Sequence, residues 1–325
     1  MIKDQFNRIF KYIRIAVNEK CNLRCIYCMP ETGISFKPES DLLSKDEIVR
    51  VVRILTANGL NKVRLTGGEP LLRNDIVDIV KDIRQSSIES INMTTNGLLL
   101  HKYLEPLVEA GLSGFNLSLD TIRNDQFQQI TRQNKLDQVM ENLHFALSIP
   151  NITVKVNTVL MREVNEDDIP GFLKLAKEFP ITIRFIELMP FDDFQIWKTG
   201  KFMGVEFILE RIKKVIPDFI GEYGSKTEQY YFKPEGYKGA LAIIPAYTRS
   251  LCEQCDRIRL TADGSIRNCL FSNTEYNLKY IMRNGCSDED ILLFIKNAMW
   301  HKPRDGFEAE KQNKQVRTSM TQIGG

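Results

Sequence analysis

Short apolar segments alternate with amphipathic segments over the first 190 residues or so of the chain. Apolar runs of five to seven residues predict buried strands, and apolar residues at helical spacing predict the helices between them. The predicted strands cover 12–17, 62–66, 90–94, 114–118, 153–159 and 181–187, and the predicted helices begin near 45, 74, 103, 139 and 169. Six β-α units at this spacing suit parallel strands joined by right-handed crossovers.

Two local signals mark the ends of these helices. Ser44 and Glu47 have the spacing of a capping box, which predicts that the first helix starts there. Gly111 stands where the third helix should stop, because glycine readily adopts the left-handed conformation that ends helices.

An open doubly wound sheet and a partial barrel both fit this alternation. No G-x-G-x-x-G motif follows the first strand, and polar residues recur where strands end, at 66–69, 94–96, Ser118 and Glu187. Active sites of β/α barrels gather on that face. The pattern therefore favours an α/β fold in which residues 1–190 form a partial (β/α)6 barrel.

The pattern changes after Pro190. A helix is predicted over 205–215, followed by short strands at 230–232, 241–244 and 257–260, a turn at Asp263–Gly264 and two short helices. We expect residues 191–325 to form an α+β extension that closes the open side of the barrel.

Composition narrows the function. The chain has 325 residues, of which 43% are hydrophobic, and a net charge of +2, so it is neither a disordered chain nor a strongly basic nucleic-acid scaffold. No apolar run reaches the roughly 18 residues that a membrane span needs. An odd number of cysteines without a secretory signal predicts the reducing cytoplasm. We therefore expect a cytoplasmic protein with neither nucleic-acid nor membrane partners.

The seven cysteines fall into two groups of three and one alone. The groups are Cys21, Cys25 and Cys28, and Cys252, Cys255 and Cys269. Thiolates at such spacing bind iron–sulfur clusters or zinc, and three ligands leave one iron of a [4Fe–4S] cluster open. Free thiols and partial zinc sites are the alternatives. Cys286 is either a fourth ligand of a structural zinc or a small buried hydrophobic residue.

The motifs around these cysteines resemble a known family. The first group with Tyr27, together with Thr66-Gly67-Gly68-Glu69-Pro70, resembles radical S-adenosylmethionine (SAM) enzymes. LCEQCDRIRLTADGSIRNCLF over 251–271, IRFIELMP, MTTNGLLL, NLSLD, KVNTV and the terminal IGG resemble the GTP 3′,8-cyclases of molybdenum cofactor biosynthesis. The match runs from about Arg14 to Gly325. Asn7 and the segment 16–20, AVNEK, depart from the Gly and the SVTDR that are common in that family.

The resemblance implies a fold of the radical SAM type and two [4Fe–4S] clusters, one on each group of cysteines. It also implies that reductive cleavage of SAM yields a 5′-deoxyadenosyl radical, which takes the ribose 3′-hydrogen of GTP. Attack of C3′ on guanine C8 then gives 3′,8-cyclo-7,8-dihydro-GTP. The implied partners are an electron donor of the flavodoxin or ferredoxin type and a downstream cyclic pyranopterin monophosphate synthase, with the chain a monomer or homodimer.

The resemblance also implies roles for individual residues. SAM would be bound by Tyr27, Gly68, Glu69, Asn96, Ser118 and Met189. GTP would be bound by Arg14, Lys62, Arg64, Thr94, Lys155, Arg184, Arg257 and Arg259. The residues expected in catalysis are Arg14, Arg257, Arg259, Gly324 and Gly325.

The residues themselves support an anionic substrate. Arg14 and Arg64 stand inside apolar strands, where an unpaired charge is costly, so they suggest a ligand inside the barrel. A triphosphate would supply the negative charge for such cations. Tyr27 and Met189 fit an ordinary core equally well, and the terminal glycines fit a frayed end.

Two other functions remain open at this point. One is a different two-cluster radical SAM enzyme, such as one that modifies a peptide. The other is a non-catalytic protein that binds zinc or RNA on a barrel scaffold. Iron and sulfide content separates the zinc-binding alternative from both radical SAM enzymes.

Overall fold

The computed structural model describes residues 1–189, 199–217, 229–248, 252–311 and 319–322. Its strands are β1 Tyr12–Ala16, β2 Lys62–Thr66, β3 Ser90–Thr95, β4 Gly114–Ser118, β5 Thr153–Leu160, β6 Thr182–Glu187, β7 Tyr230–Phe232, β8 Ala240–Ile244, β9 Arg257–Leu260, β10 Ser265–Arg267 and β11 Tyr276–Asn277. They form an 11-stranded sheet in the order β11-β10-β9-β1-β2-β3-β4-β5-β6-β8-β7. Strands β1 to β6 pair in parallel in chain order.

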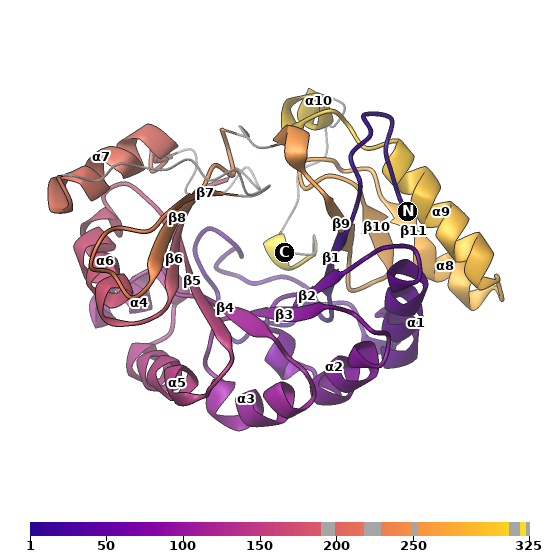
Figure 1. Ribbon diagram of the computed structural model, residues 1–325, viewed down its shortest axis with the longest axis horizontal. Helices are drawn as coiled ribbons and strands as arrows, with labels where there is room; N and C mark the ends of the chain where they lie inside the picture. The colour runs from indigo at the N-terminus through magenta and orange to yellow at the C-terminus, as the bar shows by residue number, and fades with distance from the viewer. Residues whose placement is uncertain (190–198, 218–228, 249–251, 312–318, 323–325) are drawn as a thin grey trace.

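The helices lie mainly on the outer side of this curved sheet (Figure 1). They are α1 Lys45–Thr56, α2 Ile76–Arg84, α3 Leu100–Glu109, α4 Asn124–Thr131, α5 Leu136–Ser148, α6 Ile169–Glu178, α7 Val205–Val215, α8 Leu278–Arg283, α9 Asp288–Trp300 and α10 Gly306–Lys311. Short 3-10 helices are η1 Glu39–Asp41, η2 Pro70–Leu72, η3 Glu166–Asp168, η5 Cys252–Gln254 and η6 Met320–Gln322. The partial barrel predicted from the sequence is confirmed.

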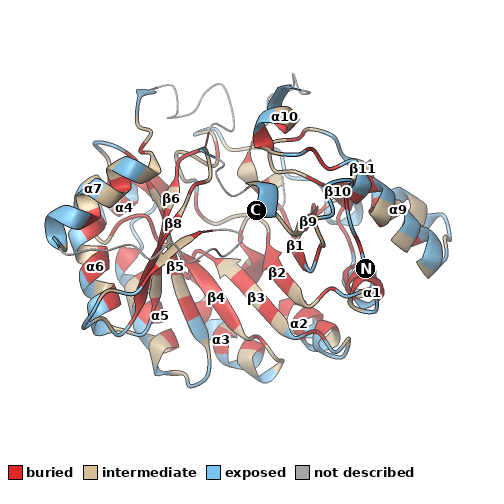
Figure 2. Ribbon diagram, turned by 45° about the horizontal axis from the view of Figure 1, so that its top comes forward, coloured by how far each residue is buried: buried red, intermediate tan, exposed pale blue. Residues whose placement is uncertain are grey.

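The two faces of the sheet differ in chemistry because successive side chains alternate. In β1, Ile13 and Ile15 are completely buried in the main hydrophobic core, and in β2 Val63 and Leu65 are buried in the same way. Arg14 alternates with the two isoleucines and so points to the opposite, concave face. Figure 2 shows how extensively the strands are buried.

The C-terminal region adds strands to both edges of the barrel sheet. Strand β8 pairs in parallel with β6, and β9 pairs in parallel with β1. Helix η6, close to the C-terminus, lies within the curve of the sheet in Figure 1. The division into units at residues 190 and 191 stays a prediction.

The structure differs from the sequence prediction in several short elements. Helix α4 and strands β10 and β11 were not predicted, and in the described residues three α-helices, rather than two, follow the Asp263–Gly264 turn. Strands of three and two residues are too short to show a period and exist through pairing with β9 and with each other. No described helix is long and apolar enough to cross a membrane.

The predicted capping box is present at the start of α1. Ser44 Oγ accepts from Glu47 N at 3.2 Å, and Glu47 Oε2 accepts from Ser44 N at 2.8 Å. We expect Ser44→Ala to lower the free energy of unfolding by about 1 kcal/mol, because the N–H group of Glu47 loses its partner. Urea unfolding of the protein measures this. The control is Ser86→Ala, because the hydroxyl of Ser86 has no hydrogen bond in the described structure. Equal losses of unfolding free energy in both variants would contradict the prediction.

Candidate active site

The first cysteine triad lies in the loop that leaves the carboxyl end of β1. It consists of Cys21, Cys25 and Cys28. The end of α4 holds this loop: Arg24 N donates to Thr131 O at 3.1 Å, and Ile26 N donates to Ile130 O at 2.9 Å. Backbone bonds between rigid elements thus fix where the three thiols stand.

Burial makes all three thiols of this triad hard to ionise. It raises the pKa of Cys21 to about 11, that of Cys28 to about 12, and that of Cys25 well above its ordinary value. The charges of Asp120, Cys28 and Cys21 raise the pKa of Cys25 further. Such thiols lose their protons when a positively charged metal centre binds them.

The Gly-Gly-Glu-Pro turn after β2 packs directly on the segment that enters the triad. Gly68 N donates to Asn18 O at 3.1 Å, and Glu69 N donates to Lys20 O at 2.8 Å. A Cβ atom at Gly68 would lie 2.3 Å from Lys20 O, and one at Gly67, where φ is +140°, 2.4 Å from Asn18 O. Both glycines therefore admit the chain's own backbone, and the contact of Gly68 with SAM stays a prediction.

Glu69 joins three parts of the site. Its fully buried carboxylate accepts from Asn96 N at 2.7 Å, Thr95 Oγ1 at 2.8 Å and Leu71 N at 3.0 Å. Asn96 Nδ2 in turn donates to Asn22 Oδ1 at 2.7 Å, inside the triad loop. Glu69 therefore orients the loop through Asn96, and its contact with SAM stays a prediction.

Burial raises the pKa of Glu69 from 4.5 to about 7. A carboxyl group whose pKa is higher in the folded than in the unfolded chain stabilises the fold fully below the unfolded pKa and loses that contribution as pH rises to the folded pKa. We expect this group to lower the free energy of unfolding by up to about 3 kcal/mol between pH about 4.5 and 7.

Unfolding of the metal-free chain across this pH range tests the expectation. The Glu69→Gln variant, which cannot ionise, should show a flatter dependence than the wild type. Glu109→Gln, at an exposed position at the end of α3, should follow the wild type. Parallel curves for wild type and Glu69→Gln would show that Glu69 does not titrate as described.

Tyr27 and Ser118 lie at the carboxyl end of β4. The Tyr27 hydroxyl donates to Asp120 Oδ2 at 2.7 Å, and Asp120 Oδ1 accepts from Val159 N at 2.8 Å. Ser118, the last residue of β4, is in register with Asn157 of β5. Tyr27 is therefore held by a polar partner rather than packed simply as a core residue.

The described part of the C-terminal tail contacts the first triad. Ser319 Oγ donates to Cys28 O at 3.0 Å, and Met320 N donates to the same oxygen at 3.2 Å. Gly324 and Gly325 lie outside the described residues, and their catalytic role stays a prediction.

Met189, after β6, belongs to a small apolar cluster that includes the tail. It packs with Ala246, Leu270, Phe271 and Met320. Because Leu270 directly follows Cys269, this cluster brings the end of β6 and the tail to the loop of the second triad.

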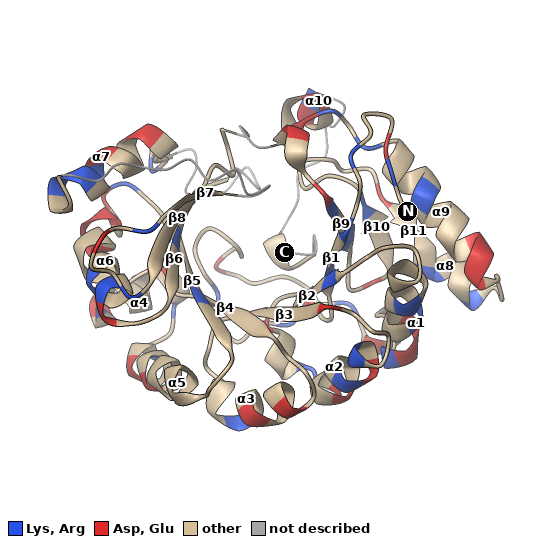
Figure 3. Cartoon of the chain, in the orientation of Figure 1, with Lys and Arg blue, Asp and Glu red and all other residues tan. Residues whose placement is uncertain are grey.

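A row of cations crosses the concave face of the sheet. Arg14 is in register with Arg64 on one side and Arg259 on the other, and Arg259 is in register with Arg267. Burial lowers the pKa of Arg259 well below its ordinary value, and the charges of Arg14 and Arg257 lower it further. Figure 3 shows this blue row on β2, β1, β9 and β10. Crowded buried cations of this kind fit a multiply charged anion.

Tyr12 stands at the centre of these cations. Its ring lies 4.9 Å from Lys62 Nζ and 5.6 Å from the Cζ atoms of both Arg14 and Arg64. Arg14 Nε donates to the Tyr12 hydroxyl at 3.1 Å, and Tyr12 is in register with Arg257. Cation–π contacts with a buried ring pre-position the charged side chains.

Asn116 of β4 connects the two sides of the concave face. With its side-chain oxygen turned to the cations, it accepts from Arg64 Nη1 and, at 3.0 Å, from Arg184 Nη1. Thr94 on β3 and Lys155 on β5 are both in register with Asn116. All the candidate GTP-binding residues thus come from adjoining strands of one sheet.

The second cysteine triad lies at the other end of the strands. It consists of Cys252, Cys255 and Cys269. Cys255 lies two residues before strand β9, which is parallel to β1, so this triad is at the amino end and the first triad at the carboxyl end. Burial raises the pKa of Cys255, but Lys302 and Arg257, with a smaller contribution from Arg259, lower it more, to about 6.

The donor sets of both triads fit iron–sulfur clusters. The thiols of the second triad interact electrostatically, as those of the first do. In the described part of the chain, no three His, Cys, Asp or Glu side chains are placed to share one metal ion. A four-iron cluster binds each thiolate on a different iron and needs no such convergence.

Cys286 is separate from both triads. Its carbonyl accepts from Arg50 Nη2 of α1 at 2.7 Å, and its half-buried side chain packs against the main core. The structure therefore gives no support to Cys286 as a fourth ligand.

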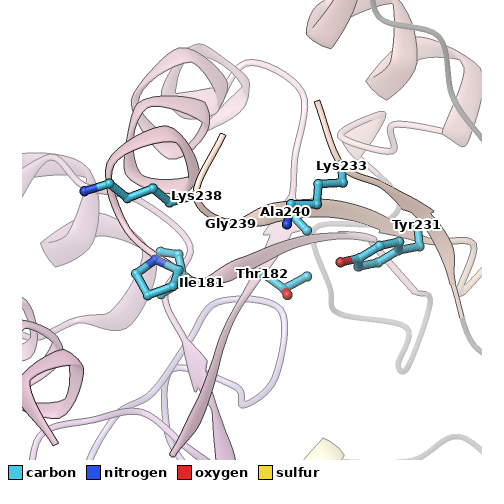
Figure 4. Close-up of a pocket in the computed structure, with 8 residues that line it drawn as sticks. Ile181, Thr182, Tyr231, Lys233, Lys238, Gly239 and Ala240 are labelled. Atoms are coloured by element: carbon cyan, nitrogen blue, oxygen red, sulfur yellow. The ribbon is translucent and has the colours of Figure 1, made fainter. Parts of the chain in front are cut away.

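A pocket of about 130 Å³ lies elsewhere, beside the amino ends of β6 and β8 (Figure 4). Thr182, Tyr231 and Lys233 contribute to its lining, and the Lys238 amine points away from it. Its exposed lysines do not converge, so we assign it no role.

Sequence reasoning missed several residues of the site. They are Tyr12, Asn116, Asp120, Arg267 and Lys302. Tyr12 shares a strand face with Arg14, and Asn116 and Asp120 lie within the matched NLSLD segment, so alternation could have indicated them. Lys302 carries no signal in the sequence.

Comparison with known proteins identifies two matching regions. Residues 15–176 match the radical SAM superfamily, and residues 181–307 match the Molybdenum Cofactor Synthesis C family. In solved structures, the crystal structure of Streptococcus suis SuiB has a TM-score of 0.64 at 14% identity, over 91% of this chain and 68% of that chain. This likeness supports the fold alone.

Curated relatives extend over the whole chain. The GTP 3′,8-cyclase of Chlorobaculum tepidum is 40% identical over 100% of this chain and 97% of its own length. Molybdenum cofactor biosynthesis protein 1 of Bos taurus is 40% identical over 93% of this chain, which spans 48% of that longer protein. The chain, with SAM and [4Fe–4S] clusters as the cofactors of its kind, belongs to the GTP 3′,8-cyclase family of the radical SAM superfamily.

Proposed function

We propose that this protein converts GTP to (8S)-3′,8-cyclo-7,8-dihydroguanosine 5′-triphosphate, the first step of molybdenum cofactor biosynthesis. The observation that carries the proposal is the cation row of the concave face, which lies between cysteine triads at opposite ends of the strands. A substrate with an anionic end and a base would fit this arrangement between two separate metal centres.

The residues of the concave face would divide the work of holding GTP. Arg257 and Arg259, next to the second triad, would hold the base. Arg14, Arg64 and Lys155 would hold the rest of the substrate, with Lys62 and Arg184 beside them. Charge-assisted hydrogen bonds from buried guanidinium groups are strong and directional, which supports their use as fixed anchors.

At the carboxyl end, the triad loop, Glu69 and Asn96 would position SAM, with Gly68, Ser118 and Tyr27 near it. When bound, the first cluster and SAM supply the 5′-deoxyadenosyl radical that removes the ribose 3′-hydrogen. The residues of the chain bring the ribose to that point and keep water away from it. Gly324 and Gly325 would complete the cavity from the tail.

The partners in the cell are also part of the proposal. An electron donor of the flavodoxin or ferredoxin type would reduce the first cluster, and a cyclic pyranopterin monophosphate synthase would consume the product. The chain would act as a monomer or homodimer in the cytoplasm, since seven reduced cysteines suit a reducing compartment.

Anaerobic reconstitution tests the proposed function. Protein loaded with iron and sulfide is incubated with GTP, SAM and dithionite, and the products are separated by chromatography. We expect 5′-deoxyadenosine and the cyclised nucleotide in equal amounts. Fully loaded protein that forms neither product would contradict the proposal. Formation of 5′-deoxyadenosine together with a different modified compound would show that the substrate is not GTP.

A further inference from the structure

Lys302 is a buried cation beyond the end of α9. It is 3% exposed, and no carboxylate in the described part of the chain forms an ion pair with it. Its ammonium group lies 5.8 Å from the centre of the Phe10 ring. Burying an ammonium group without an anionic partner costs free energy. The position of Lys302 therefore suggests a nearby anion that comes from cysteine thiolates or a group bound to them, and not from a carboxylate.

The acidic groups that Lys302 influences belong to the second triad. It interacts electrostatically with both Cys255 and Cys252. Three thiolates on a [4Fe–4S] cluster leave a net negative charge, which increases when the cluster is reduced. The cluster is therefore the anion that would balance this ammonium.

Lys302 is also hydrogen-bonded to the loop that carries Cys269. Its Nζ donates to the main-chain oxygen of Asn268, the residue directly before Cys269. Asn268 Nδ2 donates to Ala298 O of α9 at 3.0 Å, which fixes the same peptide from the other side. Lys302 thus combines a charge with a structural bond at the triad.

The turn after Lys302 is held close to Cys252, the remaining cysteine of the second triad. Arg8 donates to Pro303 O at 2.7 Å, to Arg304 O at 2.8 Å and to Cys252 O at 3.3 Å. Asp4 holds the Arg8 guanidinium at 2.5 Å. The turn and the N-terminal segment therefore keep Lys302 and the triad at a fixed separation.

We propose that Lys302 is a positioning residue for the second cluster: its buried ammonium balances the cluster's negative charge and holds the Asn268–Cys269 peptide, and so sets the cluster's retention and reduction potential. This inference rests on the proposed function, in which the second triad carries a [4Fe–4S] cluster. Lys302 acts through the cluster and is not a ligand of it.

The test uses the full chain with Cys21, Cys25 and Cys28 changed to serine, so that iron and sulfide report the second cluster alone. Lys302→Gln removes the charge and keeps a donor, Lys302→Met removes both, and Lys302→Arg keeps both. We expect reduction of the second cluster to be about tenfold less favourable in the neutral variants than in the parent, which lowers the reduction potential by about 59 mV for one electron. A dithionite titration followed by electron paramagnetic resonance measures this potential. Lys302→Met should also retain less iron, and Lys302→Arg should remain close to the parent.

Arg304→Ala is the matched control. Arg304 is a cation beside the same loop, but it is 66% exposed and pairs with exposed Glu253 at 3.3 Å, so its loss should not move the potential. If Lys302→Met fails to fold, Lys302→Gln should still fold, because glutamine keeps a hydrogen-bond donor for the main-chain oxygen of Asn268. Unchanged iron content and potential in both neutral variants would overturn the inference.

The outcomes also separate this inference from the proposed function. A parent chain that binds no cluster at the second triad would refute both. A chain that binds the cluster with a potential set by Lys302, but does not cyclise GTP when both triads are intact, would refute the function and leave the inference standing.

Discussion

Serine in place of Cys25 is expected to abolish formation of 5′-deoxyadenosine, a loss of more than about 100-fold. The serine hydroxyl ionises far less readily than a thiol, so the iron that Cys25 binds loses its ligand. Cys25 is half-buried in the triad loop, and the four described thiols outside this triad lie in other parts of the chain. Iron content should fall from that of two clusters toward that of one.

Cys286→Ser provides the control for this experiment. Cys286 is a half-buried cysteine away from both triads, bonded through its carbonyl to Arg50. Its replacement should leave iron content and turnover unchanged. Production of 5′-deoxyadenosine by Cys25→Ser at the wild-type rate would show that this triad is not the site of SAM cleavage.

The second large effect is expected at Arg259. Arg259→Met should lower kcat/KM for GTP cyclisation by about 100-fold or more, because losing one buried charge-assisted contact with an anion costs about 2–5 kcal/mol. Cleavage of SAM in the absence of GTP should persist, since α4 and the Gly-Gly-Glu-Pro turn hold the backbone of the first triad loop, whereas Arg259 is on β9. Product analysis with and without GTP separates the two activities.

The same variant should be at least as stable as the wild type without substrate. Arg259 is 4% exposed and is repelled by Arg14 and Arg257, so a methionine of similar length removes a desolvated charge. Thermal unfolding measures this. Arg53→Ala, which removes an exposed arginine paired with Asp288, is the control and should change neither activity nor stability appreciably. If Arg259→Met is less stable than the wild type, its loss of activity would be explained by a weakened fold rather than by a lost contact with GTP.

Much of the fold is predictable because its signals are local. The capping box at Ser44 and the stop at Gly111, where φ is +108°, depend only on residues a few positions apart. The six parallel strands appear as short apolar runs for the same reason. Helix α4 has only eight residues and ends at Arg132 with φ of +58°, a conformation that arginine does not signal.

The site is predictable to the extent that its residues are close in sequence. The spacing of Cys21, Cys25 and Cys28 indicates a metal centre by itself, because three thiols within eight residues reach one cluster in any compact loop. The structural work of Glu69 was not predictable, since its three donors come from β3 and the turn, and their convergence depends on folding.

The order of the strands and helices, the two cysteine triads and the family can be read from the sequence alone. Folding of the chain determines which cations meet, at which ends of the strands the triads lie, and that Lys302 is buried beside one of them. These contacts depend on the pairing of β9 with β1 across more than 240 residues of chain. That pairing places Arg259 next to Arg14, and no local pattern encodes a contact between segments so far apart.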